Sequence, residues 1–141
     1  MASSSESVAR AGVIECIASV TLVRAALLIL GYRRTRLLLD RVSDLSKRRT
    51  NSIFANTSTV AEIVDQLSNV VVYVPARIIC LERSLALYLI LRRRGLSPHM
   101  CIGVRPLPLV AHAWVELAGA PLNEDPDVTC GFPVLRATHG F

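Results

Sequence analysis

The sequence has few aromatic residues and no paired cysteine motif, and both absences exclude classes of protein. Only seven residues are Phe, Tyr or Trp, so the core must be built largely from Leu, Val, Ile and Ala, which favours helices over an all-β fold. The cysteines at positions 16, 80, 101 and 130 form no C-x-x-C pair and no repeated Cys/His spacing. We therefore expect no structural zinc site, no other metal and no cofactor.

Acidic residues are outnumbered by basic ones, and the net charge is +5. This charge suits an acidic peptide, a membrane surface or nucleic acid. Nucleic acid is disfavoured, because the basic residues are not interleaved with aromatic ones and no finger spacing accompanies them. The basic clusters near residues 33–36, 47–49 and 92–94 are expected at solvated helix ends, where cations complement the helix dipole.

Long uncharged apolar runs are also missing. Glu15 and Arg24 leave eight uncharged residues between them in the apolar N-terminal region, whereas about 20 are needed to span a bilayer. A basic segment followed by a small-residue cleavage site is not found either. We predict a cytoplasmic protein with free thiols, and leave open a peripheral membrane contact of residues 8–30.

Apolar periodicity predicts two helices in the first third of the chain. The first runs from about Val8 to Leu30 and stops at Gly31, and the second from about Arg34 to Leu45. Residues 46–58 are polar and aperiodic, which is typical of a linker. This pattern predicts a helical subdomain at residues 1–50 and a core domain at residues 51–141.

The remainder predicts helices followed by strands. One helix begins near Thr59 and ends before Pro75, and the next runs from about Cys80 to Arg94. Two strands follow, and a third extended segment starts near Pro121. The tail from residue 128 is expected to be mostly irregular. Helices followed by an antiparallel hairpin, at 99–105 and 109–117, indicate an α+β fold.

The stretch CLERSLALYLILRRRG, residues 80–95, begins with a cysteine at the start of an apolar helix. The positive end of the helix dipole favours a thiolate there, which a nucleophilic cysteine needs. Nucleophilic catalysis also needs a base and a group that orients the base. The alternative is that Cys80 is one more small buried residue, the common situation of a free cysteine.

A base and several acids occur in AHAWVELAGAPLNEDPD, residues 111–127. Alternation along the strand puts His112 on the same face as Trp114. From spacing alone, a Cys-His-acid site and a packed, hydrogen-bonded histidine both remain open. If the chain turns near Gly119, three carboxylates return beside His112: Glu124, Asp125 and Asp127.

Taken in order, CLERSLALYLILRRRGL, GVRPLP and AHAWVELAGAPLNEDPD resemble the core of the transglutaminase-like leader peptidases of lasso peptide biosynthesis. The resemblance runs from about Pro75 to Val128 and is weaker over the N-terminal helices. It implies a papain/transglutaminase-like core with the nucleophile helix packed on a small antiparallel sheet. It also implies a cysteine protease that removes the leader of a precursor peptide before a separate cyclase closes the core peptide.

Carried over by position, the resemblance implies that Cys80 is the nucleophile and His112 the general base and acid. The third catalytic residue of the family, usually Asp, falls on Glu124, with Asp125 as a substitute. Trp114 is a candidate for binding leader side chains, and a core aromatic with its N–H satisfied is the alternative. The implied partners are the precursor leader, a small leader-recognition protein and the lasso cyclase.

Two other functions fit the same residues. Transglutaminases and arylamine acetyltransferases use such a Cys-His-acid set for acyl transfer to an amine. A catalytically silent adaptor would instead bind peptide or membrane through the helical half of the chain.

Overall fold

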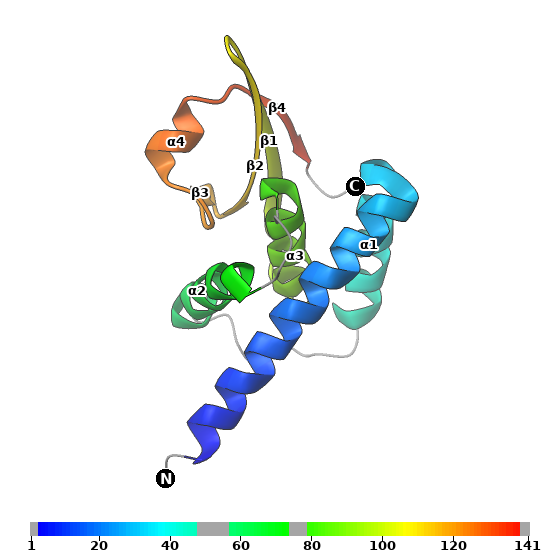
Figure 1. Ribbon diagram of the computed structural model, residues 1–141, viewed down its shortest axis with the longest axis vertical. Helices are drawn as coiled ribbons and strands as arrows, with labels where there is room; N and C mark the ends of the chain where they lie inside the picture. The colour runs from blue at the N-terminus through cyan, green and yellow to red at the C-terminus, as the bar shows by residue number, and fades with distance from the viewer. Residues whose placement is uncertain (1–2, 48–56, 74–78, 139–141) are drawn as a thin grey trace.

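The chain forms a layer of helices against one antiparallel sheet (Figure 1). The computed structural model describes residues 3–47, 57–73 and 79–138. The helices are α1 (Ser3–Lys47), α2 (Thr57–Tyr73), α3 (Cys80–Arg93) and the short α4 (Pro126–Cys130). The strands are β1 (His99–Pro106), β2 (Leu109–Leu117), β3 (Ala120–Pro121) and β4 (Val134–Thr138). The predicted α+β fold is confirmed.

α1 consists of two helical arms joined at Gly31. The φ of 72° and ψ of 170° at Gly31 lie in a region that is essentially restricted to glycine. Because the residue interrupts the helical geometry there, the chain changes direction between the arms (Figure 1). The two helices predicted on either side of Gly31 correspond to these arms.

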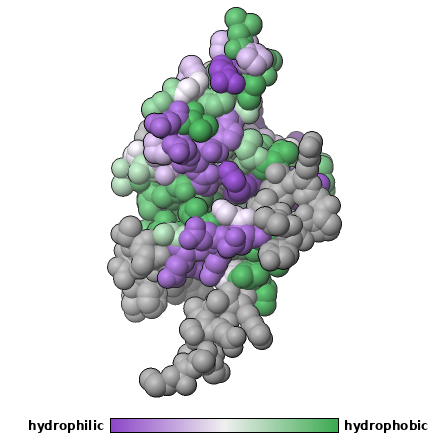
Figure 2. All heavy atoms as spheres, turned by 60° about the vertical axis from the view of Figure 1, so that its left-hand side comes forward, coloured by the Kyte–Doolittle hydropathy of each residue, from purple (hydrophilic) through white to green (hydrophobic). Residues whose placement is uncertain are grey.

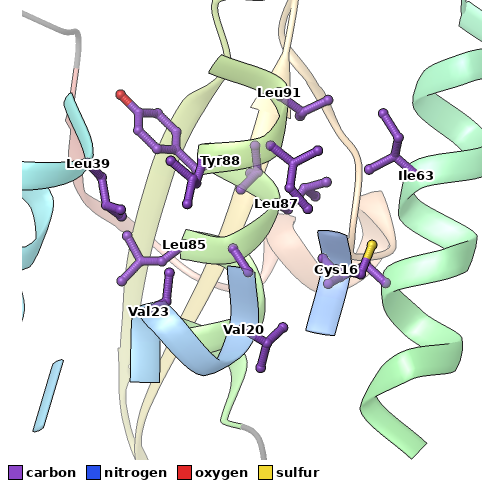
Figure 3. Close-up of a cluster of buried hydrophobic side chains, with 14 of the residues drawn as sticks. Cys16, Val20, Val23, Leu39, Ile63, Leu85, Leu87, Tyr88 and Leu91 are labelled. Atoms are coloured by element: carbon purple, nitrogen blue, oxygen red, sulfur yellow. The ribbon is translucent and has the colours of Figure 1, made fainter. Parts of the chain in front are cut away.

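α3 is the central element of the hydrophobic core. Every residue from Ser84 to Leu91 is buried, as expected of a helix that is covered on all sides. Figure 3 shows side chains from α1 and α2 packed around it. The surrounding residues come from α1, α2 and the sheet: Cys16, Val20, Val23, Leu39, Ile63, Leu67, Met100, Ala113 and Val115.

Ion pairs and hydrogen bonds attach α1 to the far end of α3. Arg92 pairs with Asp44 at 2.8 Å, and Arg94 with Glu15 at 2.9 Å. The Tyr88 hydroxyl donates to Asp40 at 2.7 Å. The basic cluster of residues 92–94 lies at a helix end as expected, and acidic side chains of α1 pair with it there.

One stretch of α1, Gly12–Val42, is long and apolar enough to cross a membrane by length and composition, a test that core helices and signal sequences also pass. The charges of Glu15 and Arg24 in this stretch predict that it does not span a membrane. In the fold, Glu15 pairs with Arg94 and Arg24 lies 3.8 Å from Glu82. One side of α1 therefore belongs to the core, and the other exposes large apolar side chains: Ile14, Leu22, Leu28 and Ile29.

The sheet has the strand order β3-β2-β1-β4, and its neighbouring strands are antiparallel. The expectation of a mostly irregular tail is wrong, since residues 126–138 contain α4 and β4. The missed strand obtains its hydrogen bonds from β1, a partner distant in sequence, and a local pattern does not show such pairing. Residues 48–56 of the predicted linker lie outside the described residues.

Because α3 is central to the core, we predict that Leu85→Ala lowers the free energy of unfolding substantially. Leu85 is fully buried, and truncating a buried leucine costs about 2–5 kcal/mol of unfolding free energy because a cavity is left. Leu28→Ala is the control, because Leu28 is exposed on α1 and its truncation should change stability by no more than about 0.5 kcal/mol. Urea denaturation followed by circular dichroism measures both, and equal losses would contradict the assignment of the core.

Candidate active site

Cys80 is the first residue of α3 and carries a free thiol. Ile79 is the N-cap in an extended conformation, and its N–H donates to the Glu82 carboxylate at 3.3 Å. Cys80 is half-buried and packs against the core. The predicted position of the cysteine at a helix N-terminus is therefore confirmed.

The face of α3 that carries Cys80 is joined to β2. Cys80, Arg83 and Ser84 share this face, because residues three and four positions apart are neighbours on a helix. The buried Ser84 hydroxyl donates to the carbonyl of Ala113 at 2.9 Å. The oxygen of the Ser84 hydroxyl also accepts a hydrogen bond from the Asn123 side-chain amide at 2.9 Å. The start of α3 is therefore fixed to the strand that carries His112.

The direction of α3 determines which part of β2 lies near Cys80. A short connection joins α3 to β1, and β2 is antiparallel to β1, so α3 and β2 run in the same direction (Figure 1). One helical turn rises about 5.4 Å, close to the length of two strand residues. Since Ser84 contacts Ala113, we expect Cys80, one turn earlier, at the level of Ala111 and His112.

His112 and Glu124 are in direct contact. The distance between His112 Nε2 and Glu124 Oε2 is 2.6 Å. Positive φ angles at Ala118 and Gly119 turn the chain after β2, as the sequence predicted. Asn123 then anchors the returning segment, because its side-chain oxygen accepts the Val115 N–H at 2.8 Å.

Asp125, the predicted substitute for Glu124, has a different environment. Its carboxylate accepts the backbone N–H of Asp127 at 2.9 Å and caps α4. Capping of this kind satisfies an N–H that has no partner within the helix. Of the candidate acids, Glu124 is therefore the one that contacts His112.

Arg83 links the acid to the helix that carries the cysteine. Its Nη2 lies 3.5 Å from Glu124 Oε2 and donates to the carbonyl of Asn123 at 3.0 Å. Glu124 thus lies between a histidine and an arginine. From the sequence, Arg83 and Ser84 flank Cys80 and are candidates either for polar contacts at the rim of the site or for capping and (i, i+4) pairing. Asn123 carries no sequence signal that marks it as a site residue.

Two aromatic rings flank His112. The centroid of the Phe132 ring lies 5.4 Å from that of His112, and the centroid of Trp114 lies at 6.2 Å. Trp114 is buried, and its indole N–H donates to Glu116 at 2.8 Å. Trp114 therefore has the geometry of the core-aromatic alternative, and the less buried Phe132 was not considered from the sequence.

A glycine makes room for these rings. A Cβ at Gly103 would lie 2.6 Å from Phe132 Cβ and 3.0 Å from the Trp114 ring. Because real Cβ atoms essentially never approach that closely, a side chain here would displace the residues that pack on His112.

Some predicted features stay untested. Among residues 3–47, 57–73 and 79–138, no hydrogen bond joins the Cys80 thiol to His112, and their pairing stays a prediction. Nor does that part of the chain contain a group of three or more side chains that could hold a metal ion.

The buried cysteines differ from Cys80 in environment. Burial, followed by the charge of Glu116 and a hydrogen bond to it, raises the pKa of the Cys101 thiol to about 11. Burial and the nearby Glu15 charge also raise the pKa of Cys16. Both groups remain protonated thiols at neutral pH, and a protonated thiol is a poor nucleophile.

Comparison with known proteins agrees with this architecture. Residues 19–137 match the model of the transglutaminase-like superfamily, and the chain belongs to that superfamily. A particular relative is the microcin J25-processing protein McjB of Escherichia coli, which is 43% identical over 49 residues. The matched segment covers 35% of this chain and 24% of that protein. No solved structure matches the chain.

The environments of the cysteines predict their order of alkylation. With a pKa of about 11, only about one thiol in a thousand is ionised at pH 8, so Cys101 should resist iodoacetamide in the folded protein. Exposed Cys130 is the internal control and should be labelled. Peptide mapping by mass spectrometry measures both. In urea Cys101 should become reactive, and equal labelling of the two in the native protein would refute the prediction.

Proposed function

We propose that this chain is a cysteine peptidase that removes the leader from a lasso peptide precursor before a separate cyclase closes the core peptide. The observation that carries the proposal is the 2.6 Å contact between His112 and Glu124, at the level of a cysteine that begins a helix. Membership of the transglutaminase-like superfamily and the similarity to a microcin-processing protein support it.

The contacts of His112 suggest how its two ring nitrogens are used. Nε2 lies against the Glu124 carboxylate, so Nδ1 is the nitrogen that would accept the proton of Cys80. A carboxylate in this position holds the imidazole in one tautomer and stabilises the imidazolium that forms. Arg83 lies on the other side of Glu124 and keeps its oxygen in place.

Cleavage would then follow two steps. The Cys80 thiolate attacks the carbonyl carbon at the end of the leader, and the sulfur–carbon bond forms as the carbonyl oxygen takes the negative charge. As the carbon–nitrogen bond breaks, His112 gives its proton to the departing amine. Water, deprotonated by His112, next attacks the thioester and releases the leader acid and the free Cys80 thiol.

The start of α3 suits the charged intermediate. The first N–H groups of a helix have no partner within that helix, and the helix dipole is positive at this end. The Cys80 N–H is therefore our candidate oxyanion donor, because such donors stabilise the negative oxygen of an acyl-transfer intermediate.

The proposal includes partners and a location. A small leader-recognition protein would hold the precursor, and the cyclase would receive the core peptide. The exposed apolar side of α1 and its arginines offer a docking face for these partners or for peripheral contact with a membrane. We place the protein in the cytoplasm.

Cys80→Ala and His112→Ala should each abolish cleavage, because one removes the nucleophile and the other the base. Cys130→Ala is the matched control and should cleave at the wild-type rate, since Cys130 is exposed on α4. The assay incubates the chain with the recognition protein and the precursor, and mass spectrometry reports the products. Undiminished cleavage by Cys80→Ala or His112→Ala would overturn the proposed mechanism.

Exchanging the two neighbouring carboxylates for amides should separate their roles. Glu124→Gln should lower kcat by about 10²–10⁴-fold, because an amide neither fixes the histidine tautomer in the same way nor balances its charge. Asp125→Asn should stay within about twofold of wild type, since asparagine also caps a helix. The same cleavage assay, run as a time course, gives kcat. The reverse order of effects would make Asp125 the orienting acid.

Acyl transfer to an amine is an alternative reaction of the same thioester intermediate. Hydrolysis should release the leader as a free acid, even when a primary amine such as methylamine is added at millimolar concentration. A product whose mass shows the leader joined to methylamine through an amide would identify a transferase instead.

A further inference from the structure

Among the described residues, the outer edge of β2 has no strand partner over most of its length. In the order β3-β2-β1-β4, β3 pairs only with Glu116 and Leu117. Within the described ranges, β2 from Leu109 to Trp114 is therefore paired on the β1 side alone. Such an edge presents N–H and C=O groups to which another extended chain can bind.

Hydrogen bonds show which residues of β2 face that edge. The Val115 N–H donates to Asn123, and the Val115 carbonyl accepts from Leu122, so Val115 faces away from β1. Ala111 is paired in register with Val104 of β1. The Val104 N–H donates to the carbonyl of Pro133, on the side of β1 that faces away from β2. Because strand residues alternate, Ala111 and Ala113 also direct their backbone groups away from β1.

Ala111 is the residue at which this edge is open. The carbonyl of Ala113 is already taken by Ser84. The structure describes no bond to the N–H and C=O of Ala111 from that side, and Ala111 is exposed. Its methyl side chain lets another backbone approach closely. Ala111 is also adjacent to His112 and at the level of Cys80.

The hairpin that joins β1 to β2 exposes apolar side chains next to the open edge at Ala111. Leu107 and Leu109 are 88% and 80% exposed, and Val110 is also exposed. Figure 1 shows this hairpin projecting from the sheet, and Figure 2 shows apolar residues at its end. A peptide that adds a strand obtains its affinity from main-chain hydrogen bonds and its specificity from the surfaces that meet alternate side chains.

We infer that the leader binds in an extended conformation along the outer edge of β2, with one of its residues exchanging main-chain hydrogen bonds with Ala111. This inference rests on the proposed function and adds the binding mode of its substrate. Leucines at the hairpin tip contact apolar side chains of the leader, and the added strand carries the scissile bond past His112.

A backbone methylation scan tests the inference on the wild-type protein. The probes are synthetic copies of a lasso peptide precursor, each N-methylated at one of the residues before the cleavage site. Methylation at the one position whose N–H bonds to Ala111 should lower kcat/KM about tenfold or more, and methylation of either adjacent residue should change it far less, because the adjacent N–H groups point away from β2. Equal losses at adjacent positions, or no loss at any position, overturn the inference.

Ala111→Pro gives the complementary test on the protein. Proline removes an N–H that faces away from β1, so no hydrogen bond to β1 is lost. Precursor cleavage should fall about tenfold or more, whereas hydrolysis of p-nitrophenyl acetate, which uses Cys80 and His112 but no main-chain hydrogen bond to Ala111, should fall much less. Equal loss of both activities, or of neither, overturns the inference. If wild type does not cleave the unmethylated precursor, the proposed function itself fails.

Discussion

The hydroxyl of Ser84 is the contact on which the arrangement of the site depends. It is fully buried, donates to the carbonyl of Ala113 and accepts from Asn123. A buried hydroxyl that lost these partners would cost free energy, so the helix, the strand and the returning loop are held in one register. Cys80, His112 and Glu124 belong to these three segments. Their relative positions therefore depend on this buried contact, together with the hydrogen bonds that join Arg83 and Val115 to Asn123.

The core supports that contact by burying α3 on all sides. α1 and α2 cover one side of the helix, and the sheet covers the other. At the far end of α3, Arg92 and Arg94 pair with acids of α1. The N-terminal end of α3, by contrast, meets the edge of the sheet, and Cys80 there remains half-buried. The same helix is thus a core element at one end and a functional surface at the other.

Glu124 illustrates how a side chain is selected from a run of acids. Three carboxylates follow β2 within four residues, and their spacing does not distinguish them. Asn123 fixes the direction of the segment through Val115, and Arg83 attracts the next carboxylate. The Asp125 carboxylate instead caps α4 by accepting the Asp127 N–H. The longer glutamate side chain reaches His112 from a position on the returning loop.

The order and type of the main helices and strands depend on interactions between residues close in sequence, so they could be predicted from the sequence. Gly31 ended a helix because of its backbone conformation, and apolar periodicity identified α3. Alternation put His112 and Trp114 on one face of β2. What the tertiary structure decided were contacts between distant segments. They include β4 on β1, the pairing of the terminal arginines of α3 with α1, the hydrogen bonds of Ser84, and Glu124 rather than Asp125 beside His112. No local pattern specifies these partners, because each depends on where the packed core brings the backbone.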